Sequence, residues 1–150
     1  MYRIALAALA AATLATALPA AAQFRNAEAA IKYRQSVMQV QSFHLGRVFA
    51  MANGRIPFDA KVAADDAALL DTIDKLPFVA FVDGSDKGNT KAKPEIWKER
   101  AKFDAAAQKM QEEVAKLSAA AKTGNLDAIK AAAGPVGAAC KACHDSYQAQ

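Results

Sequence analysis

The chain ends with GAACKACHDSYQAQ, residues 137–150, and this stretch holds both cysteines of the 150-residue sequence. Cys140 and Cys143 are separated by two residues, and His144 follows the second cysteine directly. The alanines around them favour helix. On a helix, residues three apart project from one face, so both thiols would lie on the same side with the imidazole beside them. The spacing predicts one site built from two thiols and an imidazole.

The C-x-x-C-H pattern is typical of covalent haem attachment. Each sulfur can form a thioether with a former vinyl group, and His144 can bind the iron as an axial ligand. A disulfide between the cysteines would close a very small loop. A thioredoxin-like redox pair normally opens a helix in a βαβ unit, and the sequence predicts no strands. A zinc site would want four protein ligands, and the only other histidine, His44, is distant in sequence. The pattern therefore favours one haem c, bound through two thioethers.

The rest of the chain predicts helices, because apolar residues recur at helical spacing between capping and breaking residues. The expected helices run from Ala27 to about Ala52 after Asn26, from Asp59 to the break at Pro77, from Pro94 to near Thr123-Gly124, and from Leu126 to about Tyr147 after Asn125. Pro135 should bend or divide the last helix. The fold class that follows is all-α, an antiparallel up-down four-helix bundle enclosing the haem, with one long irregular loop before Pro94.

The composition indicates a helical bundle whose side chains alone do not fill its core. Residues 23–150 contain 28 alanines but only six leucines and five isoleucines. Alanine buries little apolar area, so we expect the porphyrin to supply core volume that the side chains lack. The same residues carry 18 basic and 15 acidic side chains, a net charge of +3. Because this charge is mild and scattered, nucleic acid is not an expected partner.

The first 22 residues have the pattern of a cleaved signal peptide. Arg3 supplies a basic start, Ile4 to Leu18 form an apolar or small run, and Ala20-Ala21-Ala22 provide a cleavage site. The 15-residue run is short for a bilayer span, which takes about 20 apolar residues. We expect residues 1–22 to be removed, residues 23–150 to form one haem domain, and no membrane association.

Several blocks of sequence, in order along nearly all of residues 23–150, resemble the cytochrome c′ family of bacterial periplasms. They are KYRQSVM (32–38), HLGR (44–47), GRIPFDA (54–60), LPFVAF (76–81), KPEIW (93–97) and GAACKACHDSY (137–147). The resemblance implies a periplasmic bundle, often a homodimer, with one haem c whose iron is usually five-coordinate and high-spin. It also implies binding of nitric oxide and carbon monoxide and the transfer of one electron with a redox partner that the sequence does not identify.

The resemblance also assigns roles to individual residues. Met38 corresponds to the position over the distal face, where a methionine either packs as a lid or binds the iron as the sixth ligand. The other cofactor-binding candidates are Arg34 and Gln35 at the propionates, Phe78 and Phe81 as pocket walls, and Glu95 at the haem edge. Gln148 replaces a basic residue usual in the family, four residues after His144. His44 lies outside the inner stripe of its helix and is expected to face solvent.

Two functional classes follow. A masked sixth site favours a protein that binds nitric oxide or carbon monoxide, whereas ligation by Met38 favours a low-spin electron-transfer cytochrome. An enzyme is not expected, because the sequence offers no nucleophile-base pair and no paired carboxylates beside the haem.

Overall fold

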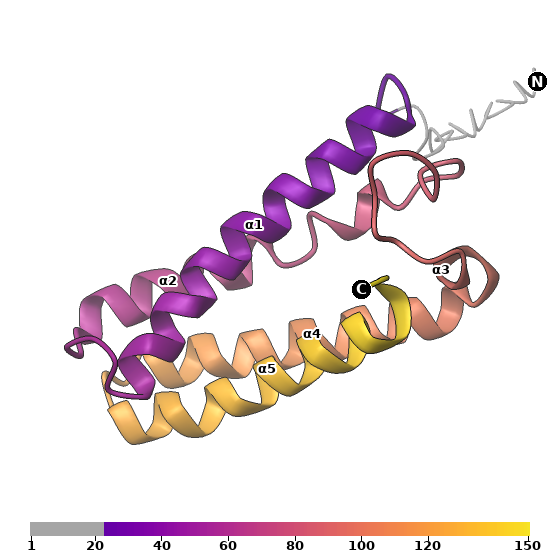
Figure 1. The fold of residues 1–150 in the computed structure, drawn as a ribbon. Helices are drawn as coiled ribbons and strands as arrows, with labels where there is room; N and C mark the ends of the chain where they lie inside the picture. Colours follow the sequence, from indigo (N-terminus) through magenta and orange to yellow (C-terminus); the bar gives the residue numbers. More distant parts are fainter. Residues whose placement is uncertain (1–22) are drawn as a thin grey trace, which may run out of the picture.

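The computed structural model describes residues 23–150, so the expected signal peptide lies outside the described residues. The main helices are α1 (Ala27–Ala52), α2 (Ala60–Ile73), α4 (Arg100–Ala121) and α5 (Leu126–Tyr147), with short helices η2 (Phe78–Ala80) and α3 (Glu95–Lys98) between α2 and α4. Figure 1 shows α1 and α2 as one antiparallel pair, with α4 and α5 as a second pair beside it. The predicted all-α four-helix bundle is confirmed.

Side-chain caps set the starts of three main helices. Asn26, Asp59 and Asn125 each accept a hydrogen bond from the backbone N–H three residues later, at 2.8, 3.0 and 3.0 Å. A polar cap of this kind satisfies a donor that the first helical turn leaves free. Gly124, with φ of +66°, takes the left-handed conformation that lets the chain turn from α4 into α5. Sequence and structure agree at these boundaries.

The predicted third helix is wrong at its start. The helix that begins after Pro94 ends at Lys98, and α4 starts separately at Arg100. Glu99 leaves the helical region with φ of −120° and ψ of 41°. Residues on both sides of this break are hydrogen-bonded to the loop before Pro94. Trp97 Nε1 donates to the Val82 carbonyl at 3.2 Å, and Arg100 Nη1 donates to the Phe81 carbonyl at 3.1 Å. Neither contact is visible in local sequence.

Pro135 does not divide the last helix, since α5 continues from Leu126 to Tyr147 with the proline inside it. Gly134, Pro135 and Ala131 are all exposed. The Ala131 carbonyl, which a proline four residues later deprives of its partner, therefore stays accessible to water. The free-energy cost of the lost hydrogen bond is therefore small, and packing of α5 along α4 keeps the helix continuous.

Two clusters of buried side chains form the core. One lies among the main helices and includes Val48, Leu70, Leu117 and Ile129. The other contains Phe81, Ile96, Phe103 and Tyr147, with Met38, Phe78, Trp97 and Cys143 packed against it. This aromatic cluster fixes the loop after α2 to the carboxyl end of α5, which is where the predicted site lies. Within residues 23–150, no helix combines the length and apolar character needed to cross a membrane.

Candidate functional site

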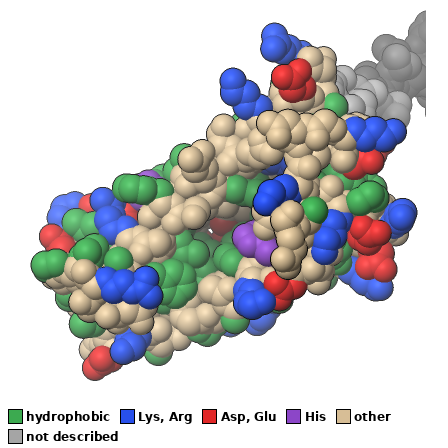
Figure 2. All heavy atoms as spheres, viewed as in Figure 1, with side chains coloured by type: hydrophobic (Ala, Val, Ile, Leu, Met, Phe, Trp, Pro, Cys, Tyr) green, Lys and Arg blue, Asp and Glu red, His purple; other side chains and the backbone are tan. Residues whose placement is uncertain are grey.

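A cavity of about 360 Å³ lies between the two helix pairs. Figure 2 shows the hollow on the face between α1 and α5, with a histidine at its edge. Eight of the predicted site residues line it: Arg34, Gln35, Met38, Phe78, Phe81, Cys140, Cys143 and His144. The volume falls within the range of about 300–1,000 Å³ that is usual for cofactor and ligand pockets. Fold and sequence thus bring nearly all the predicted residues to one place.

The thiols and the imidazole come from α5. Cys140 and Cys143 are free and half-buried, and His144 is exposed at the cavity edge. Burial raises the pKa of both thiols, and the neighbouring Cys140 adds to the effect on Cys143. Both sulfurs therefore keep their protons at neutral pH, whereas a reactive redox pair has a lowered pKa. Their chemistry suits attachment of a group to α5 better than thiol exchange.

The wall opposite α5 contains an apolar and aromatic patch. Met38 from α1 is half-buried and lines the cavity, as do Phe78 and Phe81 at η2. The Phe78 and Phe81 rings stack with centroids 6.3 Å apart, and Phe81 meets Phe103 edge-on at 4.8 Å. Such pairs lock each ring against its neighbours. The side chains of Met38, Phe78 and Phe81 therefore form a fixed apolar surface on this side of the cavity.

Arg34 performs a role that sequence reasoning missed. Its buried guanidinium donates from Nη1 to the Ala80 carbonyl at 3.0 Å and to Ser85 Oγ at 2.7 Å, and from Nη2 to the Ser85 carbonyl at 2.6 Å and to Thr90 Oγ1 at 2.8 Å. It also stacks over Phe81, with Cζ 4.4 Å from the ring centroid. Burial lowers its pKa to about 10, which leaves it charged at neutral pH. Arg34 ties α1 to the loop, and no local pattern in the loop signals this.

Gln35 and Glu95 are held more loosely. Gln35 is exposed and donates from Nε2 to the Asn89 carbonyl at 2.9 Å. Glu95 is not among the residues that line the cavity, and its carboxylate lies 3.7 Å from Lys98 Nζ. Among the predicted site residues, only Glu95 is left outside the cavity wall.

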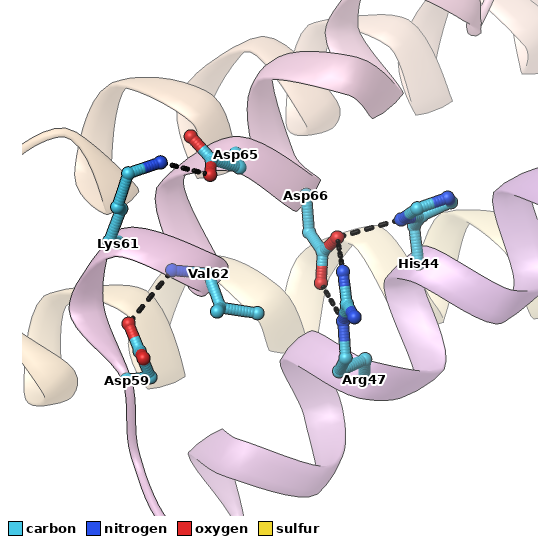
Figure 3. Close-up of polar contacts among 7 residues, drawn as sticks. All are labelled: His44, Arg47, Asp59, Lys61, Val62, Asp65 and Asp66. Carbon is cyan, nitrogen blue, oxygen red and sulfur yellow. Dashed lines mark hydrogen bonds and ion pairs between the residues drawn. The ribbon is translucent and has the colours of Figure 1, made fainter.

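The expectation that His44 faces solvent is wrong. Its Nδ1 lies 2.7 Å from Oδ1 of the buried Asp66, and its side chain is only 20% exposed. Arg47 donates from Nε to Asp66 Oδ2 at 2.6 Å and from Nη2 to Oδ1 (Figure 3). The helical phase of α1 correctly placed His44 outside the inner stripe that lines the cavity, but α2 covers the face on which His44 lies. A buried carboxylate on α2 cannot be read from α1 alone.

Asp74, at the carboxyl end of α2, is a cavity residue that the sequence did not reveal. It is 3% exposed, and its Oδ1 has no hydrogen-bond partner within residues 23–150. Burial raises the pKa of this carboxyl, and the nearby charge of Asp71 raises it further. Its helical spacing from the buried Leu70 is the one local signal of its burial, and that spacing does not show that its carboxylate lacks a partner.

Gln148 stands at the cavity edge and caps α5. It lines the cavity in an extended conformation, and its N–H donates to the His144 carbonyl at 2.9 Å. It also forms an antiparallel bridge with Ala92. The helix thus ends before Gln148. An arginine at this position would therefore extend from a residue in the extended conformation and not from the last helical turn.

The residues present fit a covalently held porphyrin. Two protonated thiols and an accessible imidazole on one helix face the same cavity as an apolar wall, which is the donor set that haem attachment needs. Within residues 23–150, no cluster of three or more His, Cys, Asp or Glu residues could hold a bare metal ion. Fold and site together define a helical-bundle protein of the c-type haem class.

Comparison with known proteins identifies the family within this class. The family model for cytochrome c′ matches residues 29–148. A cytochrome c′ of Rubrivivax gelatinosus is 53% identical over 127 residues, covering 84% of this chain and 98% of that protein. A cytochrome c′ of Alcaligenes xylosoxydans xylosoxydans is 44% identical over 126 residues, covering 84% and 98%. The chain belongs to the cytochrome c′ family.

Solved structures agree with this assignment. The crystal structure of the Rubrivivax gelatinosus protein is similar with a TM-score of 0.81 and 53% identity, over 84% of this chain and 99% of that one. Variants of cytochrome c prime from Alcaligenes xylosoxidans have been solved with nitric oxide and with carbon monoxide bound. Each has a TM-score of 0.79 and 42% identity, over 85% of this chain and 99% of that one.

Proposed function

We propose that this chain is a periplasmic haem c protein that binds nitric oxide or carbon monoxide at a five-coordinate, high-spin iron and can carry one electron. One observation carries the proposal: Cys140, Cys143 and His144 on α5 line the same cavity as an apolar wall formed by α1 and η2. The two thioethers would hold one haem, and His144 would be its axial ligand. The haem supplies gas binding and one-electron redox chemistry.

The remaining cavity residues position and shield the group. Met38, Phe78 and Phe81 would form an apolar patch on the wall opposite α5, and a small gas ligand would displace Met38 to reach the iron. Arg34 holds the loop that carries Phe81 in place. Arg34 and Gln35 would also bind the haem propionates, and the groups able to donate are Nε of Arg34 and the exposed amide of Gln35. Glu95 would act only at the haem edge.

Export and assembly belong to the same proposal. The leader-like sequence of residues 1–22 supports a periplasmic location, where haem would be attached. A homodimer through α1 is supported by apolar side chains on its outer face, since Phe43 is 65% exposed and Val40 is 44% exposed. Light scattering of the purified protein measures the assembly directly. The redox partner stays unassigned.

The test is the ultraviolet-visible spectrum of purified holoprotein, ferric and dithionite-reduced, before and after carbon monoxide or nitric oxide. We expect a broad reduced Soret band without sharp α and β bands, and a shift when gas is added. Mass spectrometry should show one covalent haem, lost in Cys140→Ala/Cys143→Ala. A protein that is exported and folded but carries no covalent haem would overturn the proposal.

A second candidate is a low-spin electron-transfer cytochrome with Met38 as the sixth ligand. The observation that favours it is the half-buried position of Met38 in the cavity wall across from the helix that bears His144. Sharp α and β bands that resist carbon monoxide would select this function. In that case Met38→Leu should convert the spectrum to the broad form and restore gas binding, while Met110→Leu, a second methionine in the cavity wall, serves as the control.

A further inference from the structure

Asp74 is a buried acid for which the proposed haem function has no use. It follows the last turn of α2, is 3% exposed, and lines the same cavity as Cys143 and His144. Its Oδ1 has no hydrogen-bond partner within residues 23–150. Burying a carboxylate without partners is costly, and such a group usually takes up a proton or serves a purpose.

The groups facing Asp74 compensate its charge only in part. On its own segment, Asp71 disfavours the carboxylate, while the charge and backbone N–H of Lys75 favour it. From α1, the terminal nitrogens of Arg34 are engaged by the loop, and the Gln41 amide donates to the Ile73 carbonyl at 3.0 Å.

The other cavity walls add few charges. Lys91 is the only charged residue that the loop contributes to the lining, and α4 contributes apolar side chains alone. From α5 the titratable lining groups are Cys140, Cys143, His144 and Tyr147. Burial and Asp71 together raise the pKa of Asp74 above its ordinary value. Its protonation is therefore sensitive to any new charge placed in the cavity.

We propose that Asp74 is a proton-binding site coupled to the oxidation state of the iron in this cavity. When a one-electron donor protein reduces the iron, the Asp74 carboxylate takes up one proton from solvent and becomes a neutral carboxylic acid; oxidation releases the electron to an acceptor and the proton to solvent. This inference rests on the proposed haem function.

The physical reason is charge balance at a buried carboxyl group. Reduction removes one positive charge from the cavity, and at low dielectric a unit charge affects a buried neighbour far more than it does in water. The carboxylate is stabilised by the ferric state and loses that stabilisation on reduction. The pKa of Asp74 is therefore higher in the reduced protein, and between the two pKa values each electron brings a proton.

The test is the reduction potential of the holoprotein as a function of pH, measured by spectroelectrochemistry. We expect the potential of the wild type to fall with rising pH in a window above the ordinary aspartate pKa of about 3.9. The slope reaches up to about 59 mV per tenfold change in proton concentration, the equivalent of one proton per electron. In Asp74→Asn this step should vanish, and the potential should stay at the acid-side value of the wild type.

The matched control is Asp71→Asn, which removes an exposed carboxylate one turn earlier. This variant should keep the step but move it to lower pH, because Asp71 contributes to the raised pKa of Asp74. An Asp74→Asn protein with the same pH-dependent step as the wild type would overturn the proposal.

A second measurement detects the proton itself. The reduced-minus-oxidised infrared difference spectrum should show the C=O stretch of a neutral carboxylic acid in the wild type and in Asp71→Asn, and lack it in Asp74→Asn. A band that persists in Asp74→Asn would contradict the assignment. Protein without covalent haem would overturn both this inference and the proposed function. Haem-loaded protein with neither the step nor the band would overturn the proton coupling alone.

Discussion

Asp66 and Asp74 are both buried near the inner face of α2, yet their surroundings give their carboxyl groups opposite protonation behaviour. Burial alone would raise the pKa of Asp66, but the hydrogen bonds from Arg47 and His44 outweigh it and hold the pKa below its usual range. Asp74 receives no comparable donors, so burial raises its pKa. The two pKa values shift in opposite directions because Asp66 lies next to Arg47 and His44 of α1 and Asp74 does not.

Replacing Asp66 by asparagine should destabilise the bundle in a pH-dependent way. A carboxyl group whose pKa is lowered by folding stabilises the folded state above its unfolded pKa of about 3.9, and this stabilisation is lost as pH falls through the folded pKa. We expect Asp66→Asn to lower the free energy of unfolding by about 1–3 kcal/mol at pH 7, because Arg47 and His44 lose the buried carboxylate that they contact. The gap between the two proteins should narrow in acid. Urea denaturation at several pH values measures both effects.

The preceding residue of the same helix provides a matched control. Asp65 pairs with Lys61 at 2.6 Å, but both side chains are mostly exposed (Figure 3). Exposed pairs contribute at most about 1 kcal/mol, so Asp65→Asn should change little. Equal losses for the two variants would contradict the role given to burial of Asp66.

At the scale of elements, Arg34 of α1 makes four hydrogen bonds to the loop between α2 and α3. Arg34→Lys keeps the positive charge but loses the planar fork that reaches the carbonyls of Ala80 and Ser85. We expect a loss of about 1.5–3 kcal/mol, the range for hydrogen bonds to a charged group, together with faster amide exchange across residues 80–90. Hydrogen-exchange mass spectrometry localises the effect.

The adjacent residue provides the comparison. Gln35→Ala removes one exposed hydrogen bond to the same loop, so exchange there should stay close to wild type. If Arg34 served only as a positive charge near a haem propionate, Arg34→Lys would preserve loop protection. That outcome would contradict the assignment of Arg34 to the loop.

Sequence predicted those elements whose signals are local. The caps at Asn26, Asp59 and Asn125 mark helix starts, because a side chain three residues from its donor needs no tertiary context. The break at Glu99 and the continuity of α5 through Pro135 depend on packing against the loop and α4. Local propensity carries no information about such contacts.

For the molecule as a whole, some residues of the site have local sequence signals, and others are defined only by contacts between helices. Cys140, Cys143 and His144 were identifiable because their chemistry resides in their spacing on one helix. Met38 and the aromatic wall came from a family resemblance. Asp74 and the His44–Asp66 contact could not be predicted, since both arise from how α1 and α2 meet. Their burial is a property of the bundle and of no single helix.

The whole bundle should also respond unevenly to loss of its haem. In Cys140→Ala/Cys143→Ala apoprotein, the cluster around Leu117 and Ile129 remains enclosed by the helices themselves. The aromatic cluster around Phe103 borders the cavity, so its rings would lose a neighbour that fills about 360 Å³ or more. We expect a lower and broader thermal transition by circular dichroism, with dye-detectable apolar surface.

The direction of the loosening follows from where the cavity lies. Amide protection should survive in α4 and α5 near the turn at Gly124 and fall near Phe103 and Tyr147, because the core is complete at the first end and interrupted by the cavity at the second. Hydrogen exchange of apoprotein and holoprotein at the same pH compares the two ends within one molecule, so the turn end serves as the internal control. Uniform protection along both helices, with an equally cooperative melt, would mean that the alanine-rich helices close the core without the porphyrin.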